Sequence, residues 1–220
     1  MRAAPADGSE PRFRRLVPPA DWARLPGPVR RRFERRLAVA ETALYVGAVA
    51  RTDMTWCGRI VGQLARLVGA PLPLAPSGRV AAAVVVTEDP AQHGQVWTRL
   101  YARPGTTPQV IHSTKRFAGP TGLEECVGGG VGMRLAVAVE SRALVFRSAG
   151  FFVRLGGRAF VLPRWLTPGT IEVVHREERD GEFSFTLEVR HPWFGRIVRQ
   201  VAFFRDARAA GCLSRVRARS

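Results

Sequence analysis

The sequence predicts an α+β fold, with N-terminal helices followed by a curved, mostly antiparallel meander sheet of about eight to ten strands. Strand-like runs separated by turn residues fill the chain from Arg79 to Phe204, whereas helical periodicity is confined to the part before Arg79. No stretch as long as a crossover helix separates the runs, so successive strands must pair antiparallel. Such a sheet must curl to cover one face, either as a half-barrel or lipocalin-like wrap around a helix, or as a nearly closed barrel.

Three helices and one early strand are predicted before the main sheet. Pro18–Trp22 opens a first helical stretch with Asp21 as its N-cap, and Val29–Ala40 places apolar residues at helical spacing opposite an arginine-rich face. Trp56–Val68 has the same amphipathic pattern. Between these helices, Ala43–Arg51 favours a strand, because β-branched and aromatic residues surround a glycine there.

The main run contains nine predicted strands of alternating or continuous apolar character, bounded by Gly, Pro and Asp turns. Asp180-Gly181 is the strongest hairpin signal in the chain. The predicted strands are Val80–Thr87, Gln95–Ala102, Gln109–Phe117, Gly122–Val127, Val131–Glu140, Ala143–Val153, Ile171–Glu178, Phe183–Arg190 and Arg196–Phe204.

The net charge of +16 is concentrated at the two ends of the chain, since residues 1–36 contribute +6 and residues 205–220 contribute +4. We therefore divide the chain into a disordered Arg/Pro-rich lead (1–17), one α+β domain (18–204) and a basic tail (205–220). Lys115 is the only lysine, so the arginine excess is interpreted mainly as composition bias. A nucleic-acid partner is not favoured, while peripheral contact with a membrane surface through the arginine-rich ends stays open.

The cysteines and glycines predict neither a metal nor a cofactor. The three cysteines are widely spaced and match no zinc or disulfide framework, which favours a reduced, cytoplasmic setting. The glycine-rich run 128–132 precedes a predicted strand rather than a helix, so it lacks the context of a dinucleotide-binding loop. Apolar segments are too short to span a membrane, and the N-terminus lacks the apolar core of a signal peptide.

One strand face combines the groups that suit an amphipathic ligand. Trp97, Arg99 and Tyr101 alternate onto the same face, where rings can cover an apolar body and the guanidinium can hold a carboxylate or phosphate. Arg116 on the next strand and Trp165 are the further expected ligand contacts. In the alternative interpretation, Trp97 belongs to the core and Arg99 pairs across the sheet with one of the glutamates at positions 124 and 125.

No motif in the chain fixes a reaction. His191 and Glu124 are the candidate acid–base residues, although a histidine at a turn more often caps backbone groups. The sequence contains no nucleophile elbow, and acidic neighbours of Cys126 argue against a reactive thiolate.

The order and spacing of several short patterns resemble those of a known family. They are Tyr45-Val46-Gly47, Gly69-Ala70-Pro71-Leu72-Pro73, Trp97-Thr98-Arg99, Gly132-Met133, the run from Leu162 to Pro168, Asp180 to Phe185, and His191-Pro192 with Gly195. From about Leu25 to Phe204 the chain resembles the bacterial domain-of-unknown-function family DUF4166. Relatives in that family occur alone or fused to NAD(P)-binding reductase-like or membrane modules, which implies metabolism of a small or lipid-like molecule. Gln95 and Val201 depart from the expected pattern, in place of an acid and an aromatic residue.

These observations favour a non-enzymatic binding module for a small amphipathic or lipid-like anionic ligand. Two alternatives stay open: an isomerase- or hydrolase-type enzyme acting on a hydrophobic substrate, and an anion- or membrane-surface interaction protein that uses the arginine-rich ends.

Overall fold

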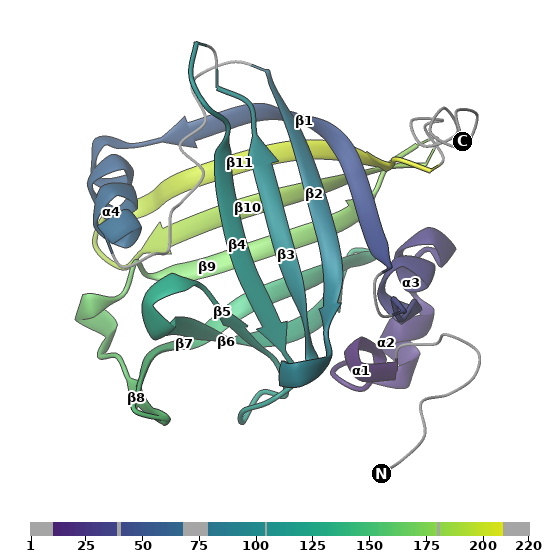
Figure 1. Ribbon diagram of the computed structural model, residues 1–220, viewed down its shortest axis with the longest axis horizontal. Helices are drawn as coiled ribbons and strands as arrows, with labels where there is room; N and C mark the ends of the chain where they lie inside the picture. The colour runs from purple at the N-terminus through teal and green to yellow at the C-terminus, as the bar shows by residue number, and fades with distance from the viewer. Residues whose placement is uncertain (1–10, 39–40, 68–78, 104, 180, 209–220) are drawn as a thin grey trace.

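The computed structural model describes residues 11–38, 41–67, 79–103, 105–179 and 181–208 (Figure 1). Its elements are α1 (Pro11–Arg14), α2 (Pro19–Ala23), α3 (Gly27–Glu34), β1 (Thr42–Met54), α4 (Trp56–Leu67), β2 (Val80–Asp89), the short 3-10 helix η1 (Pro90–Gln92), β3 (Gly94–Tyr101), β4 (Gln109–Arg116), β5 (Glu124–Cys126), η2 (Gly128–Gly130), β6 (Val131–Glu140), β7 (Ala143–Leu155), β8 (Arg158–Val161), η3 (Arg164–Leu166), β9 (Thr170–Glu177), β10 (Glu182–His191) and β11 (Gly195–Asp206).

Ten of the strands close into an antiparallel barrel. Neighbours in the ring are neighbours in the chain from β1 to β7, and the ring continues through β9, β10 and β11 back to β1. The short strand β8 pairs only with β7 and lies outside the ring. The predicted antiparallel meander is therefore confirmed, but the half-barrel is corrected to a closed barrel, because β1 bonds to both β2 and β11 and leaves no open edge.

The seam between the first and last strands depends on a glycine. Gly47 on β1 pairs with Phe204 on β11, and a Cβ at position 47 would lie 1.9 Å from the carbonyl oxygen of Phe203. Only a residue without a side chain permits this approach of the two backbones. Register shifts between Val49 and Arg51 and on two other strand pairs add the local bends that a closed sheet needs.

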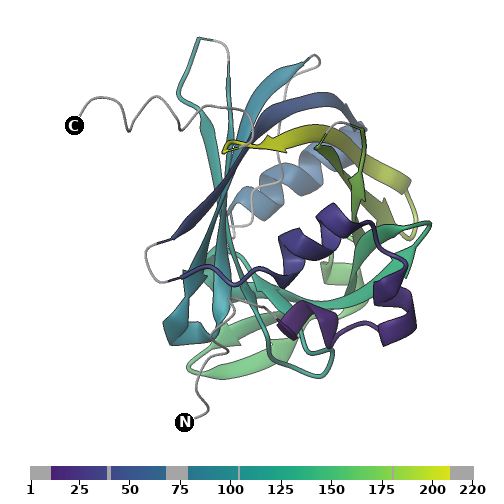
Figure 2. The same cartoon turned by 90° about the vertical axis from the view of Figure 1, so that its right-hand side faces the viewer.

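Helices cover the two ends of the barrel. Figure 2 shows α1, α2 and α3 in front of one end, with α4 at the far end. Phe13 of α1 packs edge to face on Phe33 of α3 and on Phe117, with ring centroids 5.2 and 4.8 Å apart. A wrap of the sheet around a helix, as the sequence predicts, would place the helix at Trp56–Val68 on the concave side of the sheet; α4 instead packs on the strand ends, where Cys57 meets Ile197.

The helices α1, α2 and α3, which we call the N-terminal plug, begin earlier in the chain than the sequence indicates. Residues 11–17 fall in the predicted disordered lead, yet Pro11–Arg14 is helical, and Phe13 and Val17 are only 1% and 4% exposed. At the other end, β11 extends to Asp206 and Ala207 is buried, so the domain reaches past the predicted limit at 204. Most of the predicted lead (1–10) and tail (209–220) lies outside the described residues.

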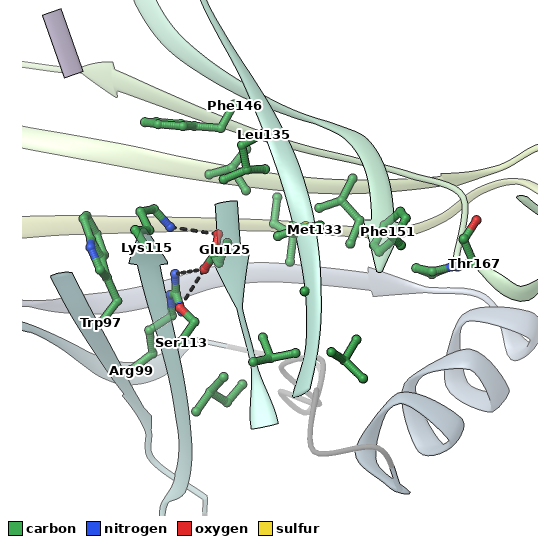
Figure 3. A pocket seen from close by; sticks show the side chains of 18 of the residues that line it. Trp97, Arg99, Ser113, Lys115, Glu125, Met133, Leu135, Phe146, Phe151 and Thr167 are labelled. Carbon is green, nitrogen blue, oxygen red and sulfur yellow. Dashed lines mark hydrogen bonds and ion pairs between the residues drawn. The ribbon is translucent and has the colours of Figure 1, made fainter. Parts of the chain in front are cut away.

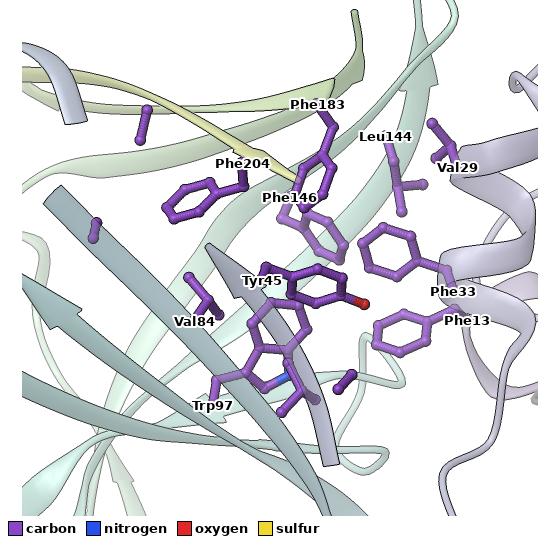
Figure 4. Packing of buried hydrophobic residues seen from close by; sticks show 14 of the residues in the cluster. Phe13, Val29, Phe33, Tyr45, Val84, Trp97, Leu144, Phe146, Phe183 and Phe204 are labelled. Carbon is purple, nitrogen blue, oxygen red and sulfur yellow. The ribbon is translucent and has the colours of Figure 1, made fainter. Parts of the chain in front are cut away.

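Most of the core lies inside the barrel, next to the N-terminal plug. Aromatic rings from the helices and from strands on opposite sides of the ring meet there (Figure 4): Phe13, Phe33, Tyr45, Trp97, Phe146, Phe183 and Phe204. In the described part of the chain, no helix is long and apolar enough to cross a membrane.

Candidate functional site

The aromatic core fills only one part of the barrel interior, and beside it lies a cavity of about 660 Å³. Its wall is largely apolar and includes Val84, Leu135, Phe146, Val173 and Ala202, which come from strands all around the ring. A volume of this size falls in the range of small-molecule sites.

The cavity reaches the surface at the α4 end. Leu64 of α4 and both Trp165 and Leu166 of η3 line it, although these side chains are 58%, 68% and 56% exposed. Residues that border a cavity and also face solvent mark its mouth. At the opposite end, Phe33 of the N-terminal plug lines the cavity and is only 4% exposed.

A hydrogen-bonded ionic cluster lies in the largely apolar wall (Figure 3). Lys115 Nζ lies 2.8 Å from Glu125 Oε2, and Arg99 Nη2 donates to Glu125 Oε1 at 3.2 Å. Ser113 Oγ donates to the same Oε1 at 2.6 Å and accepts a hydrogen bond from Arg99 Nη1 at 2.9 Å. The ammonium group of Lys115 also lies 4.9 Å from the centre of the Trp97 ring, a cation–π contact.

Strand register brings this cluster together. Trp97 on β3 pairs with Ser113 on β4, and Lys115 pairs with Gln95 on one side and with Glu125 of β5 on the other. Directly paired residues of an antiparallel sheet point to the same face, and residues two apart on one strand share a face. The side chains of Trp97, Arg99, Ser113, Lys115 and Glu125 therefore all turn toward the barrel interior. The polar residues at alternating positions on β3 and β4 thus form one continuous patch across three strands.

The cluster has an excess of one positive charge, since it contains two cations and one carboxylate. Burial alone would raise the pKa of Glu125, but the charges and hydrogen bonds of Lys115, Arg99 and Ser113 outweigh burial and lower that pKa to about 2. Burial lowers the pKa of Lys115, and Glu125 offsets part of this change. Glu125 is therefore firmly ionised, and the excess charge belongs to the two cations.

Three of the four predicted ligand contacts line the cavity. Trp97 and Arg99 lie in its wall, and Trp165 lies at its mouth. Arg99 also pairs with Glu125, as in the alternative interpretation from the sequence. The structure does not bring Arg116 to the cavity, because it alternates with the inward-pointing Lys115 and lies on the outer face of β4.

The two candidate acid–base residues are not brought together. Glu124 does not line the cavity, and its Oε2 accepts a hydrogen bond from Arg154 Nη2 at 3.0 Å. His191 does line the cavity, near the mouth, where its ring stacks on Phe194 at 4.8 Å and Nδ1 accepts from the backbone N–H of Trp193 at 3.3 Å. Across the described ranges, no three His, Cys, Asp or Glu side chains gather as metal ligands would.

Sequence reasoning missed Ser113 and Lys115 as site residues and considered Glu125 only as a pairing partner for Arg99. One signal was present: Lys115 is the only lysine in a chain with 34 basic residues, and it alternates with Ile111 and Ser113 on one strand face. An ammonium group is a compact point charge and a guanidinium group is a planar fork, so the two are not interchangeable at such a position.

Comparisons with known proteins support the family and no specific activity. Curated proteins give no significant match. Among solved structures, a single-residue mutant of the fluorescent protein UnaG is similar over 74% of this chain and 94% of its own, with 13% identity and a TM-score of 0.31, a likeness too low for any argument. The model of DUF4166, a domain of unknown function, matches residues 25–204, so the chain belongs to the DUF4166 family.

Proposed function

We propose that the barrel binds a small amphipathic, lipid-like anion, with its head group at Arg99 and Lys115 and its apolar body along the cavity wall. The observation that supports this function best is the excess positive charge of the cluster within an apolar cavity. An uncompensated buried charge is costly, and an anionic head group removes that cost by supplying the second negative charge.

The geometry favours binding over acid–base catalysis. An effective general base has a pKa near the working pH, whereas the pKa of Glu125 is about 2 and three donors occupy its oxygens. Lys115 is engaged with the same carboxylate. Glu125 is thus held ionised, and its hydrogen bonds and ion pairs hold both side chains in position, as a preorganised receptor for an anion requires.

Titration with 11-(dansylamino)undecanoic acid, followed by dansyl fluorescence, tests the proposal. We expect Lys115→Met to weaken binding about 10- to 100-fold, because it removes the excess charge and one charge-assisted contact. Arg116→Gln is the matched control: it removes a cation from the outer face of the same strand, and its Kd stays at the wild-type value.

A double variant separates net charge from simple damage to the cavity. Lys115→Met with Glu125→Gln leaves Arg99 as one excess cation, so we expect it to recover most of the affinity lost in Lys115→Met alone. Oleyl alcohol, which has the chain but no anionic head, should displace the probe far less effectively than oleate. Equal affinity in wild type and Lys115→Met would contradict the proposal.

A further inference from the structure

Large apolar side chains that face solvent are concentrated in four segments of the molecule. Ten of the eleven exposed large hydrophobic residues in the described ranges belong to them, and Val110 is the exception. We call these ten residues the apolar rim: Trp56, Ile60 and Leu64 of α4; Leu155, Phe160 and Val161 of the β7–β8 hairpin; Trp165 and Leu166 of η3; and Trp193 and Phe194 of the β10–β11 turn.

The four segments lie at one end of the barrel, around the mouth of the cavity. Met54, just before α4, pairs with Val198, which follows the β10–β11 turn, and the rings of Trp56 and Phe194 are 6.3 Å apart. η3 precedes β9, whose first residue pairs with Arg190 beside that turn. Figure 1 shows α4, the β8 hairpin and the start of β9 on the same side of the barrel.

The charge of these segments has a single sign. Residues 56–64, 154–166 and 191–196 contain five arginines and no acidic residue. Arg59, Arg158 and Arg164 are exposed and make no ion pair within the described part of the chain. Tryptophan rings and unpaired guanidinium groups on projecting turns are the side chains that settle at the boundary between lipid headgroups and acyl chains.

We infer that the apolar rim docks on a bilayer surface that contains anionic phospholipid, with the cavity mouth turned toward the lipid. Exposed apolar patches of this kind mark interaction sites, and the absence of acidic residues from residues 56–64, 154–166 and 191–196, which contain all four segments, fits a negatively charged surface. The rim surrounds an opening into an apolar cavity, so docking gives a lipid-like ligand a path that avoids bulk water. The inference rests on the rim and not on the head-group cluster, so it can fail or hold independently of the proposed function.

Co-sedimentation of the full chain with phosphatidylcholine vesicles, with and without about 25% phosphatidylglycerol, tests the docking. We expect wild type to bind the anionic vesicles, with a blue shift of tryptophan emission and weaker binding at high salt. Trp165→Ser with Trp193→Ser should lower the partition coefficient by about tenfold or more. Each of Arg59→Gln, Arg158→Gln and Arg164→Gln should lower it about fivefold.

Controls keep the outcomes distinct. Val110→Ser removes an exposed apolar residue outside the rim and should bind vesicles like wild type, as should Arg116→Gln, which removes a cation outside both the rim and the cavity. Unfolding midpoints report whether the variants fold. The inference is overturned if wild type stays in the supernatant with anionic vesicles, or if the double tryptophan variant sediments like wild type, since binding would then come from the arginine-rich ends.

Discussion

At the scale of single residues, Glu125 holds the candidate site together. Glu125 is 7% exposed, and its carboxylate is the only negative charge in contact with Arg99 and Lys115 among the described residues. The folded state holds its pKa at about 2, below the ordinary value of 4.5. A group with a lowered pKa stabilises the fold above its unfolded pKa, and that stability, on the order of 3 kcal/mol, is lost as the pH falls from 4.5 toward 2.

We therefore predict that Glu125→Gln lowers the free energy of unfolding by about 3–5 kcal/mol at pH 7, because it leaves the buried Lys115 and the partly buried Arg99 without a carboxylate. Urea denaturation measures the change. Glu140→Gln, which removes an exposed carboxylate paired with Arg147, is the matched control and should shift the midpoint much less. Adding Lys115→Met to Glu125→Gln should restore most of the stability. Equal losses of stability in Glu125→Gln and Glu140→Gln would contradict the role assigned to Glu125.

Alternation along one strand predicted the shared face of Trp97, Arg99 and Tyr101, and all three line the cavity. The same reasoning could not decide which face of the next strand joins them. That choice depends on the β3–β4 register, in which Arg99 pairs with Ile111, and a shift of one residue would have turned Arg116 inward and Lys115 outward. The alternation of residues along β3 therefore identifies which of its side chains share a face. Only the register between β3 and β4 identifies which side chains of β4 lie beside them.

At the scale of elements, the N-terminal plug is fixed to the barrel by a buried polar contact. Arg32 of α3 donates through Nη1 to Nε2 of His175 on β9 at 2.8 Å, and its guanidinium also contacts Glu177 and the Phe183 ring. Nε2 must accept this bond, so the imidazole is neutral. Burial, with the charge of Arg32, lowers the pKa of His175 well below 6.5.

This arrangement predicts that acid weakens the fold. Below pH 6.5 the unfolded chain protonates His175 while the folded protein does not, so stability falls as the pH decreases, by about 1.4 kcal/mol per pH unit until the folded pKa is reached. Urea unfolding at several pH values between about 7.5 and 5 measures this slope. His175→Gln keeps an acceptor for Arg32 and should flatten the slope. An identical slope in His175→Gln would contradict this assignment.

The elements that sequence reasoning missed are the shortest ones. β8 has four residues, all exposed, so it shows no alternation between a wet and a buried face. α1 also has four residues, too few to show helical periodicity, and Phe13 is ordered by its contacts with Phe33 and Phe117 rather than by local propensity. Long strands with clear alternation, by contrast, were placed within a few residues of their observed ends.

At the scale of the whole molecule, barrel closure follows from pairings that no local pattern records. The antiparallel order of the strands could be derived because short connections exclude crossover helices. Closure of the barrel, by contrast, depends on the pairing of β1 (residues 42–54) with β11 (residues 195–206), which lie far apart in the sequence. A glycine in a strand can signify a bulge, a bend or a close approach equally well. The role of Gly47 at the seam therefore became apparent only with the partner strand in place, and the cavity exists only because the ring is closed.

An apolar cavity with a charged cluster on its wall and a mouth at the far end predicts how affinity depends on ligand length. Each methylene that enters the cavity should contribute about 0.8 kcal/mol, or about a fourfold lower Kd. Competition of saturated straight-chain alkanoic acids, from octanoic to octadecanoic acid, against the dansyl probe measures this dependence, which should level off once the chain reaches the mouth. Val173→Trp adds a large ring to the wall, so the levelling should occur at a shorter chain. Affinity that does not change with chain length would place the ligand outside the cavity and contradict the assignment.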